Sequence, residues 1–225
     1  MNKRVSVLCA ILAATLPLFS QQSYLGFDKN IYPGDGVLPA LYKTFAYAGY
    51  WLNDPPGMNA NPWTGKRATL RNAGFGFLIL YNGRLDADLK GASPTNLGSA
   101  DAIGAAQAAK LEGFPPGAII FLDQEEGGRL LPEQVSYLRF WIEGISRTGY
   151  QPGIYCSGIE VGDGKDRTST ADVVSQEFPR ARLWVANDQC PPAPGCVARA
   201  VDPTGQRLLP SCSLAICPVA TAIFR

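Results

Sequence analysis

The sequence predicts an α/β fold, and within that class a (β/α)8 TIM-type barrel. At the C-terminal end the sequence does not decide whether the barrel is complete or irregular. Short apolar runs alternate with helical patterns, which is typical of parallel strands joined by helices. Most runs are continuously apolar, as expected for strands covered on both faces. Polar or aromatic residues follow nearly every run, and a ring of such residues at the strand ends is the layout of barrel active sites.

The strands and helices can be assigned in order along the chain. The expected strands are residues 24–27, 45–52, 75–81, 118–122, 153–156 and 183–186. The expected helices are residues 101–111 with Ser99 as N-cap, residues 133–147 and residues 169–178. A doubly wound open sheet is the alternative, but it would gather the polar residues at one switch point. No phosphate-binding GxGxxG or GxxxxGKS/T loop follows any strand, which also favours the barrel.

The N-terminus has the pattern of a secretory signal. Lys3 and Arg4 precede an apolar run over residues 5–19 that is short for a bilayer span. We therefore expect a signal peptide over residues 1–20 and a secreted, periplasmic or cell-envelope protein without stable membrane insertion after signal removal. A membrane anchor is the alternative for this segment. The barrel would then occupy residues 21–197, followed by a divergent or truncated tail over residues 198–225.

Composition excludes several functional classes. Lys and Arg number 20 against 19 Asp and Glu, so no basic excess exists for binding a nucleic acid. The chain has no histidine, which excludes Ser-His-Asp and Cys-His triads and His-ligated zinc. Acid–base chemistry at neutral pH must therefore use carboxylates, Tyr, Lys or Cys. No cofactor is expected, and the oligomeric state is open.

The cysteines lie mainly towards the C-terminus. Cys190 and Cys196 bracket a stiff Pro-Pro-Ala-Pro-Gly turn and are candidates for a disulfide in an exported protein. A zinc site and a cysteine-dependent redox function are the alternatives, and the absence of any CxxC pair weighs against both. Cys156 ends an apolar strand and is expected to be a core residue.

The most informative segment is Gly-Ala-Ile-Ile-Phe-Leu-Asp-Gln-Glu-Glu-Gly-Gly at residues 117–128. Side chains alternate along a strand, so Asp123 and Glu125 point the same way, roughly 6.6 Å apart along the chain. Two acids on one face repel, and raising one pKa divides them into an acid and a base, as glycoside hydrolysis requires. Asp28, at the end of the first strand, is expected to converge on the same barrel mouth.

Two other roles are open for these acids. They can cap the following helix or pair with Arg84 and Arg129. Asp123 and Glu125 can also join Asp188 as oxygen ligands of Ca²⁺ or Mg²⁺, but no EF-hand-like spacing supports this, and we expect no metal.

Aromatic and polar residues near the strand ends are candidates for binding a sugar, by ring stacking or by hydrogen bonds to hydroxyl groups. The predicted substrate-binding residues are Trp51, Tyr81, Asn82, Tyr155, Trp184, Asn187 and Asp188. For the aromatic members, and for Trp184 above all, packing in the barrel rim is the alternative.

Several separated motifs resemble one known family. They read GFDKNIYPGD, AGYWLNDPPGMN, GFGFLILYNGR, GAIIFLDQEEGGRLLPEQ, GYQPGIYCSGI and LWVANDQCPPAPGC, and they cover residues 24 to about 196. The chain is similar to a bacterial family of exported, glycoside hydrolase-like domains related to the family 25 lysozymes. In those lysozymes the first strand ends in Gly-Phe-Asp, the fourth in Asp-x-Glu, and a later strand carries Trp-x-Ala.

The resemblance implies roles for the matching residues. Glu125 would be the general acid, Asp123 would stabilise positive charge on the sugar or its N-acetyl group, and Asp28 would position water or substrate. The implied reaction cleaves a β-1,4 link in peptidoglycan or a related polysaccharide. The extra Glu126 and the tail after residue 197 depart from the lysozyme pattern, so a non-catalytic glycan-binding or envelope-associated barrel is the alternative function.

Overall fold

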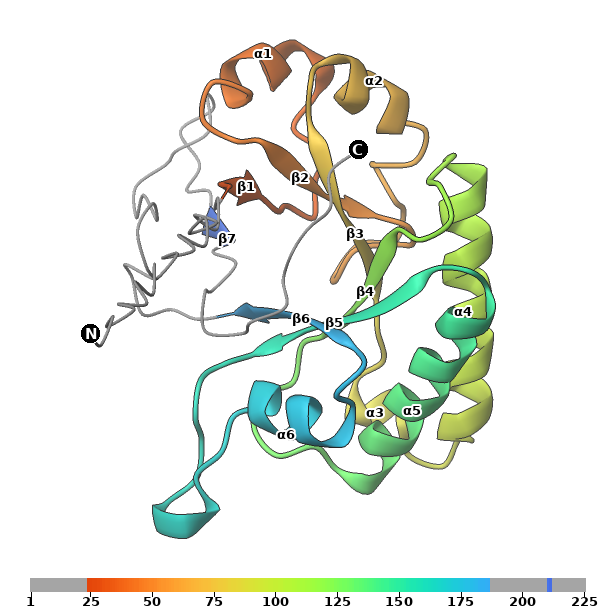
Figure 1. Ribbon diagram of the computed structural model, residues 1–225, viewed down its shortest axis with the longest axis vertical. Coiled ribbons are helices and arrows are strands. Elements are labelled where there is room, and N and C mark those ends of the chain that lie inside the picture. The colour runs from red at the N-terminus through yellow and green to blue at the C-terminus, as the bar shows by residue number, and fades with distance from the viewer. Residues whose placement is uncertain (1–23, 187–209, 212–225) are drawn as a thin grey trace, which may run out of the picture.

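The computed structural model describes residues 24–186 and 210–211, and its core is one twisted sheet (Figure 1). The strand order is β6-β5-β4-β3-β2-β1-β7. The strands are β1 Gly26–Phe27, β2 Tyr47–Trp51, β3 Gly76–Asn82, β4 Ile119–Gln124, β5 Gln151–Ser157, β6 Arg182–Ala186 and β7 Pro210–Ser211. The six strands expected from the sequence are therefore confirmed, with small shifts at their ends.

The strand order excludes one of the two predicted architectures, the doubly wound sheet. Strands β1 to β6 are all parallel, and each pairs with the next one in the sequence. A doubly wound sheet reverses its strand order at a switch point, and this sheet does not, so that alternative is wrong. The six parallel strands form a curled half-barrel (Figure 1). The tail adds β7, which runs antiparallel to β1.

Helices connect the strands. They are α1 Leu38–Leu41, α2 Arg67–Asn72, α3 Asp86–Leu89, α4 Pro94–Leu111, α5 Pro132–Arg147 and α6 Thr170–Glu177, with 3-10 turns η1 Asp35–Val37 and η2 Gly164–Asp166. The expected helices over residues 133–147 and 169–178 are confirmed. The expected N-cap Ser99 is wrong: α4 begins at Pro94, because a proline fits the first helical turn, and Ser93 occupies the cap position.

The two faces of the sheet have different roles. Side chains alternate between a face packed on helices and a concave face. Apolar residues such as Ile79, Leu122 and Ile154 are almost fully buried. Strand register aligns Asn82 with Asp123, Asp123 with Tyr155, and Tyr155 with Trp184, so these four side chains share the concave face. The sheet therefore gathers polar and aromatic groups from neighbouring strands at its C-terminal edge.

Some expectations fall outside the described residues. They are the signal peptide, the site residues Asn187 and Asp188, the disulfide candidates Cys190 and Cys196, and the tail apart from β7. Between residues 24 and 186 and at 210–211, no helix is both long and apolar enough to span a membrane. Cys156 is a fully buried thiol in the core, as expected.

Candidate functional site

Three carboxyl groups from two strand ends lie close together at the C-terminal edge of the sheet. Asp28 directly follows β1, Asp123 is near the end of β4, and Glu125 comes just after β4. The charge of Glu125 acts on both aspartates, and that of Asp28 acts on Asp123. Asp28, Asp123 and Glu125 therefore converge in the structure, as the sequence predicts. We call these three residues the acidic trio.

Asp123 and Glu125 differ sharply in exposure. Asp123 is only 4% exposed, whereas Glu125 is exposed to solvent. Burial raises the pKa of Asp123 well above its usual value, and the negative charge of Glu125 together with a hydrogen bond between the two carboxyl groups raises it further. The pair therefore holds a proton at neutral pH, with one member reachable from solvent.

Asp28 occupies a space that a glycine leaves free. A Cβ atom on Gly49, in β2, would lie 2.5 Å from Asp28 Oδ1, so a larger residue here would displace the Asp28 side chain. Burial raises the pKa of Asp28 from 3.8 to about 7, while hydrogen bonds from the Trp51 indole and the Lys29 backbone N–H act in the opposite direction. Oδ1 of Asp28 is buried without a hydrogen-bond partner, which also disfavours the ionised form.

Trp51 therefore acts on Asp28 rather than presenting a stacking surface. Its side chain is 2% exposed, and its indole Nε1 donates to the Lys29 carbonyl at 3.2 Å as well as to Asp28. Because the Trp51 side chain is buried, it offers almost no surface to a sugar, and the predicted contact between Trp51 and a sugar does not fit this geometry. The indole instead holds the segment after β1 in place.

Replacing Trp51 by Phe is expected to raise the pKa of Asp28 further above 7, by roughly one pH unit, because the ionised carboxylate loses a donor while the core keeps a ring of similar shape. Carboxyl ¹³C NMR titration of the labelled protein measures this. Trp63→Phe is the matched control, because the Trp63 indole donates to the carbonyls of Lys29 and Asn30 and not to Asp28. An unchanged Asp28 pKa in Trp51→Phe would contradict the assignment.

Tyr155 and Trp184 form an aromatic wall beside the acidic trio. Their ring centroids are 4.5 Å apart, and Phe121 packs edge-on against Trp184 at 6.2 Å. Burial, followed by the charges of the acidic trio, raises the pKa of the half-buried Tyr155, so its phenol stays protonated. Trp184 is only 4% exposed, so its ring is packed inside the protein. Of the predicted aromatic residues, Tyr155 is the one that faces the acids with part of its surface accessible.

Tyr81 and Asn82 lie on opposite faces, because neighbouring strand residues alternate. The Tyr81 ring packs on Trp141 of α5 at 5.3 Å, so it points to the helices and away from the acidic trio. Asn82 shares the concave face with Asp123, but its Nδ2 donates to the Asp54 carbonyl at 3.0 Å. Asn53 adds two bonds to the Asn82 backbone, at 2.7 and 3.1 Å. The two asparagines thus join the ends of β2 and β3.

Among the described residues, the structure does not give the acidic trio the two alternative roles, pairing with Arg84 or holding a metal ion. Arg84 pairs with Asp101 of α4 at 2.8 Å, not with the acidic trio. Glu126, which points to the other side, accepts hydrogen bonds from the Asp86 backbone at 2.7 Å and from Gln134 at 2.6 Å, and so ties α3 to α5. Within the part of the chain that the structure describes, no three His, Cys, Asp or Glu side chains are arranged to hold a metal ion.

Two supporting residues were not identified from the sequence. Trp63 is fully buried and its indole donates to the carbonyls of Lys29 and Asn30 at 3.0 and 3.2 Å, which fixes the loop after Asp28. Tyr137 of α5 donates to Asp101 at 2.8 Å. Both contacts join segments more than 30 residues apart, so no local pattern marks them.

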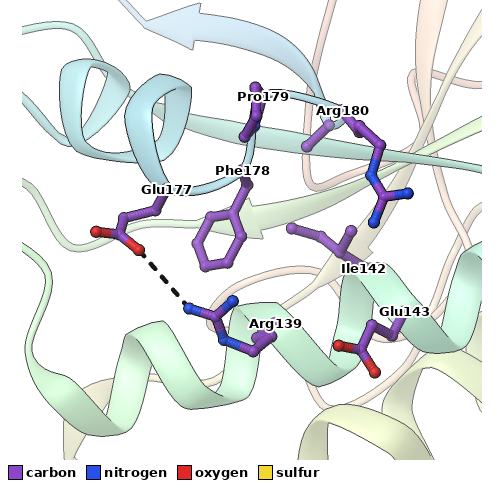
Figure 2. Close-up of a pocket in the computed structure, with 8 residues that line it drawn as sticks. Arg139, Ile142, Glu143, Glu177, Phe178, Pro179 and Arg180 are labelled. Atoms are coloured by element: carbon purple, nitrogen blue, oxygen red, sulfur yellow. Dashed lines mark ion pairs between the residues drawn. The ribbon is translucent and has the colours of Figure 1, made fainter.

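A small hollow of about 220 Å³ lies between α5 and the segment leading into β6 (Figure 2). Arg139 pairs there with Glu177 at 3.6 Å and lies 5.4 Å from the ring centroid of Phe178. Ala181, which also lines it, immediately precedes β6, so the hollow is at the N-terminal edge of the parallel sheet. It is therefore at the opposite edge from the acidic trio, and its ion pair holds α6 against α5.

Comparison with solved structures supports the fold. An uncharacterised protein of B. stearothermophilus matches with a TM-score of 0.55 and 19% identity over 82% of this chain and 86% of that chain. The Tat-secreted protein Rv2525c of Mycobacterium tuberculosis, solved in complex with HEPES, matches with a TM-score of 0.50 and 17% identity over 81% of this chain and 84% of that chain. At these identities the likeness concerns the fold alone.

The structure is also similar, more weakly, to that of an autolysin. The modular autolysin LytC of Streptococcus pneumoniae matches with a TM-score of 0.44 and 11% identity over 60% of this chain and 33% of that chain, too low to bear on function. Among curated proteins, no sequence matches this chain significantly.

The family comparison covers most of the strands and the acids at 123 and 125. The profile of the Rv2525c-like, glycoside hydrolase-like domain matches residues 45–191, which is more than half of the chain. This match agrees with the resemblance stated from the sequence motifs and with the sheet described above. The protein is a member of the Rv2525c-like, glycoside hydrolase-like domain family.

Proposed function

We propose that this protein hydrolyses a glycosidic bond in a bacterial cell-wall glycan, with a β-1,4 link of peptidoglycan as the leading substrate. One observation carries the proposal: a buried Asp123, whose pKa is raised by burial and by the neighbouring acids, is hydrogen-bonded to an exposed Glu125, with Asp28 beside them. Glycoside hydrolysis needs a carboxyl group that can give a proton and a second carboxylate that can stabilise positive charge. Membership of a glycoside hydrolase-like family agrees with this chemistry.

In the proposed mechanism Asp123 and Glu125 act as a unit that holds one proton. Glu125, which solvent can reach, delivers this proton to the glycosidic oxygen as the bond from that oxygen to the sugar C1 breaks. The pair is then fully ionised, and Asp123 stabilises the positive charge that develops on the sugar or its N-acetyl group. A water oxygen adds to C1, and the proton it loses returns to the pair.

Asp28 and Tyr155 support this sequence in the proposal. With a pKa of about 7, Asp28 can accept or donate a hydrogen bond near neutral pH, and this suits a group that positions water or substrate. Tyr155 keeps its proton and offers a phenol donor beside the acids. Export by the predicted signal over residues 1–20, and closure of the half-barrel into an eight-stranded barrel, are further parts of the proposal.

Turnover of purified peptidoglycan tests the function. We expect the wild-type protein to create new reducing ends, and borohydride reduction followed by acid hydrolysis identifies the amino sugar that carries them. An α-1,4 glucan serves as the negative control. Binding to peptidoglycan without new reducing ends would contradict the hydrolase proposal and favour a non-catalytic glycan-binding protein.

A further inference from the structure

A second polar pocket lies next to the acidic trio, on the far side of the end of β3. Its volume is about 420 Å³, within the range of small-molecule sites. Residues that line it include Asp54, Tyr81, Asn82, Arg84, Asp88 and Asp101. They come from the ends of β2 and β3 and from α3 and α4. None of them belongs to the acidic trio.

One wall of this pocket is held by an ion pair between the buried Asp101 and the partly exposed Arg84. Asp101 is 5% exposed and accepts hydrogen bonds from Nε and Nη2 of Arg84, at 2.8 and 2.9 Å, and from the Tyr137 hydroxyl at 2.8 Å. Burial and the charge of Asp101 raise the pKa of Tyr81 to about 12, so this phenol stays protonated. These groups are fixed before any ligand arrives, and such preorganisation lowers the entropic cost of binding.

The pocket presents mainly hydrogen-bond acceptors and negative charge. Three of the lining residues carry a carboxylate and one carries a guanidinium, and two of the acidic residues, Asp54 and Asp88, are exposed. The amide N–H₂ of Asn82 donates to the Asp54 carbonyl, and two guanidinium nitrogens of Arg84 are bound to Asp101. A ligand must therefore supply most of the donors, which hydroxyl and ammonium groups do. Anionic ligands are repelled by the excess carboxylates.

One strand end separates this pocket from the acidic trio. Gly83, which lines the pocket, donates its backbone N–H to the Asp123 carbonyl at 3.2 Å, and Asn82 is in register with Asp123. A Cβ on Gly83 would lie 2.5 Å from that carbonyl oxygen, so glycine is needed for this close approach. The pocket and Asp123 therefore lie at the same edge of the sheet, on either side of the end of β3, and a chain-like ligand that crosses this strand end reaches both.

We propose that this pocket is a second sugar-binding position, and that it selects a neutral or amine-bearing ring and rejects an anionic one. The proposal rests on the proposed action on a glycan and names its substrate class. The preferred substrate is a cell-wall glycan that is partly de-N-acetylated, so that a glucosamine unit with a free amino group lies next to the bond that the acidic trio cleaves. Asp54 and Asp88 are the residues that determine this preference.

The selection is tested by measuring, with isothermal titration calorimetry, how tightly the protein binds three tetrasaccharides. They are composed of glucosamine, of N-acetylglucosamine and of galacturonic acid. The background is Glu125→Gln, which prevents turnover under the proposed mechanism. The test variant is Asp54→Asn with Asp88→Asn, because asparagine keeps an acceptor for the Leu85 N–H that Asp88 now accepts at 3.1 Å. Asp163→Asn, which removes an exposed charge in the loop before η2, is the matched control.

We expect the glucosamine tetrasaccharide to bind tightest, and the double variant to weaken its binding about tenfold while the control does not. The double variant is also expected to improve binding of the galacturonic acid tetrasaccharide. No binding of any of the three, or equal glucosamine binding with and without Asp54 and Asp88, would overturn the pocket assignment. A wild-type protein that creates no new reducing ends in peptidoglycan would instead overturn the proposed function, and the glucosamine comparison would still report on the pocket.

Discussion

Replacing Glu125 by Gln is expected to lower kcat/KM for peptidoglycan by roughly 10²- to 10⁴-fold, the range in which general acid catalysis contributes. Glutamine keeps the size and one acceptor of the side chain but cannot deliver the proton that Asp123 and Glu125 share. Because Glu125 is exposed, the change removes no buried contact, and the fold should be unaffected. The initial rate of reducing-end formation measures the loss, and circular dichroism checks the fold.

Glu126→Gln is the matched control for this experiment. Glu126 is the next residue and the same side chain, but it binds the Asp86 backbone and Gln134 on the helix-facing side. Its substitution should leave the catalytic rate close to that of the wild type at a temperature well below unfolding. Equal rates for wild type and Glu125→Gln would remove Glu125 from the mechanism, and a loss shared equally by both variants would point to a general effect of charge at this strand end.

The second prediction concerns the cost of keeping Asp28 at the site. Its pKa is 3.8 in an ordinary environment and about 7 in the folded protein. A raised folded-state pKa means that folding favours the protonated form, so this contribution to stability is complete below pH 3.8 and is lost as the pH rises through about 7. A shift of this size corresponds to roughly 4 kcal/mol, of which we expect about half, because Asp28 as a residue keeps part of its surface accessible to water although its Oδ1 is buried.

Asp28→Asn should therefore stabilise the protein by about 2 kcal/mol at pH 8 and have little effect near pH 4. Urea unfolding at the two pH values measures the difference. Asp35→Asn is a control of opposite sign, because hydrogen bonds from Tyr32 and Lys66 lower the pKa of Asp35, and its loss should reduce stability at neutral pH. An Asp28→Asn variant that is no more stable at pH 8 than at pH 4, relative to wild type, would contradict the raised pKa.

A stabilising Asp28→Asn that also impairs turnover would be typical of a functional site. Active sites hold charged groups in environments that disfavour them, and the fold bears that cost elsewhere. Here Trp51 and Trp63 are almost fully buried and both donate to the segment after Asp28, so they hold this segment in place despite the unfavourable environment of the Asp28 carboxylate.

Local patterns were sufficient for the strands, the two later helices and the acids. Apolar runs of strand length and the helical spacing of residues 133–147 reflect interactions within one segment, and strand alternation alone put Asp123 and Glu125 on one face. The same alternation, applied to Tyr81 and Asn82, would have separated them, since neighbours in a strand cannot both face the acids. The convergence of Asp28 with the acids of β4 followed from the rule that parallel strands end at one edge.

Folding in three dimensions decided the rest. The sequence gives no sign that Trp51 is 2% exposed and bound to the loop after β1, or that Arg84 pairs with Asp101 and leaves the acidic trio alone. Burial, ion pairing and the pKa of a carboxyl group depend on which distant segments pack around it, and that is a property of the assembled sheet and its helices. The sequence determined that Asp123 and Glu125 lie at a strand end. Only the packing determined that the pKa of Asp123 is raised and that Glu125 is exposed to solvent.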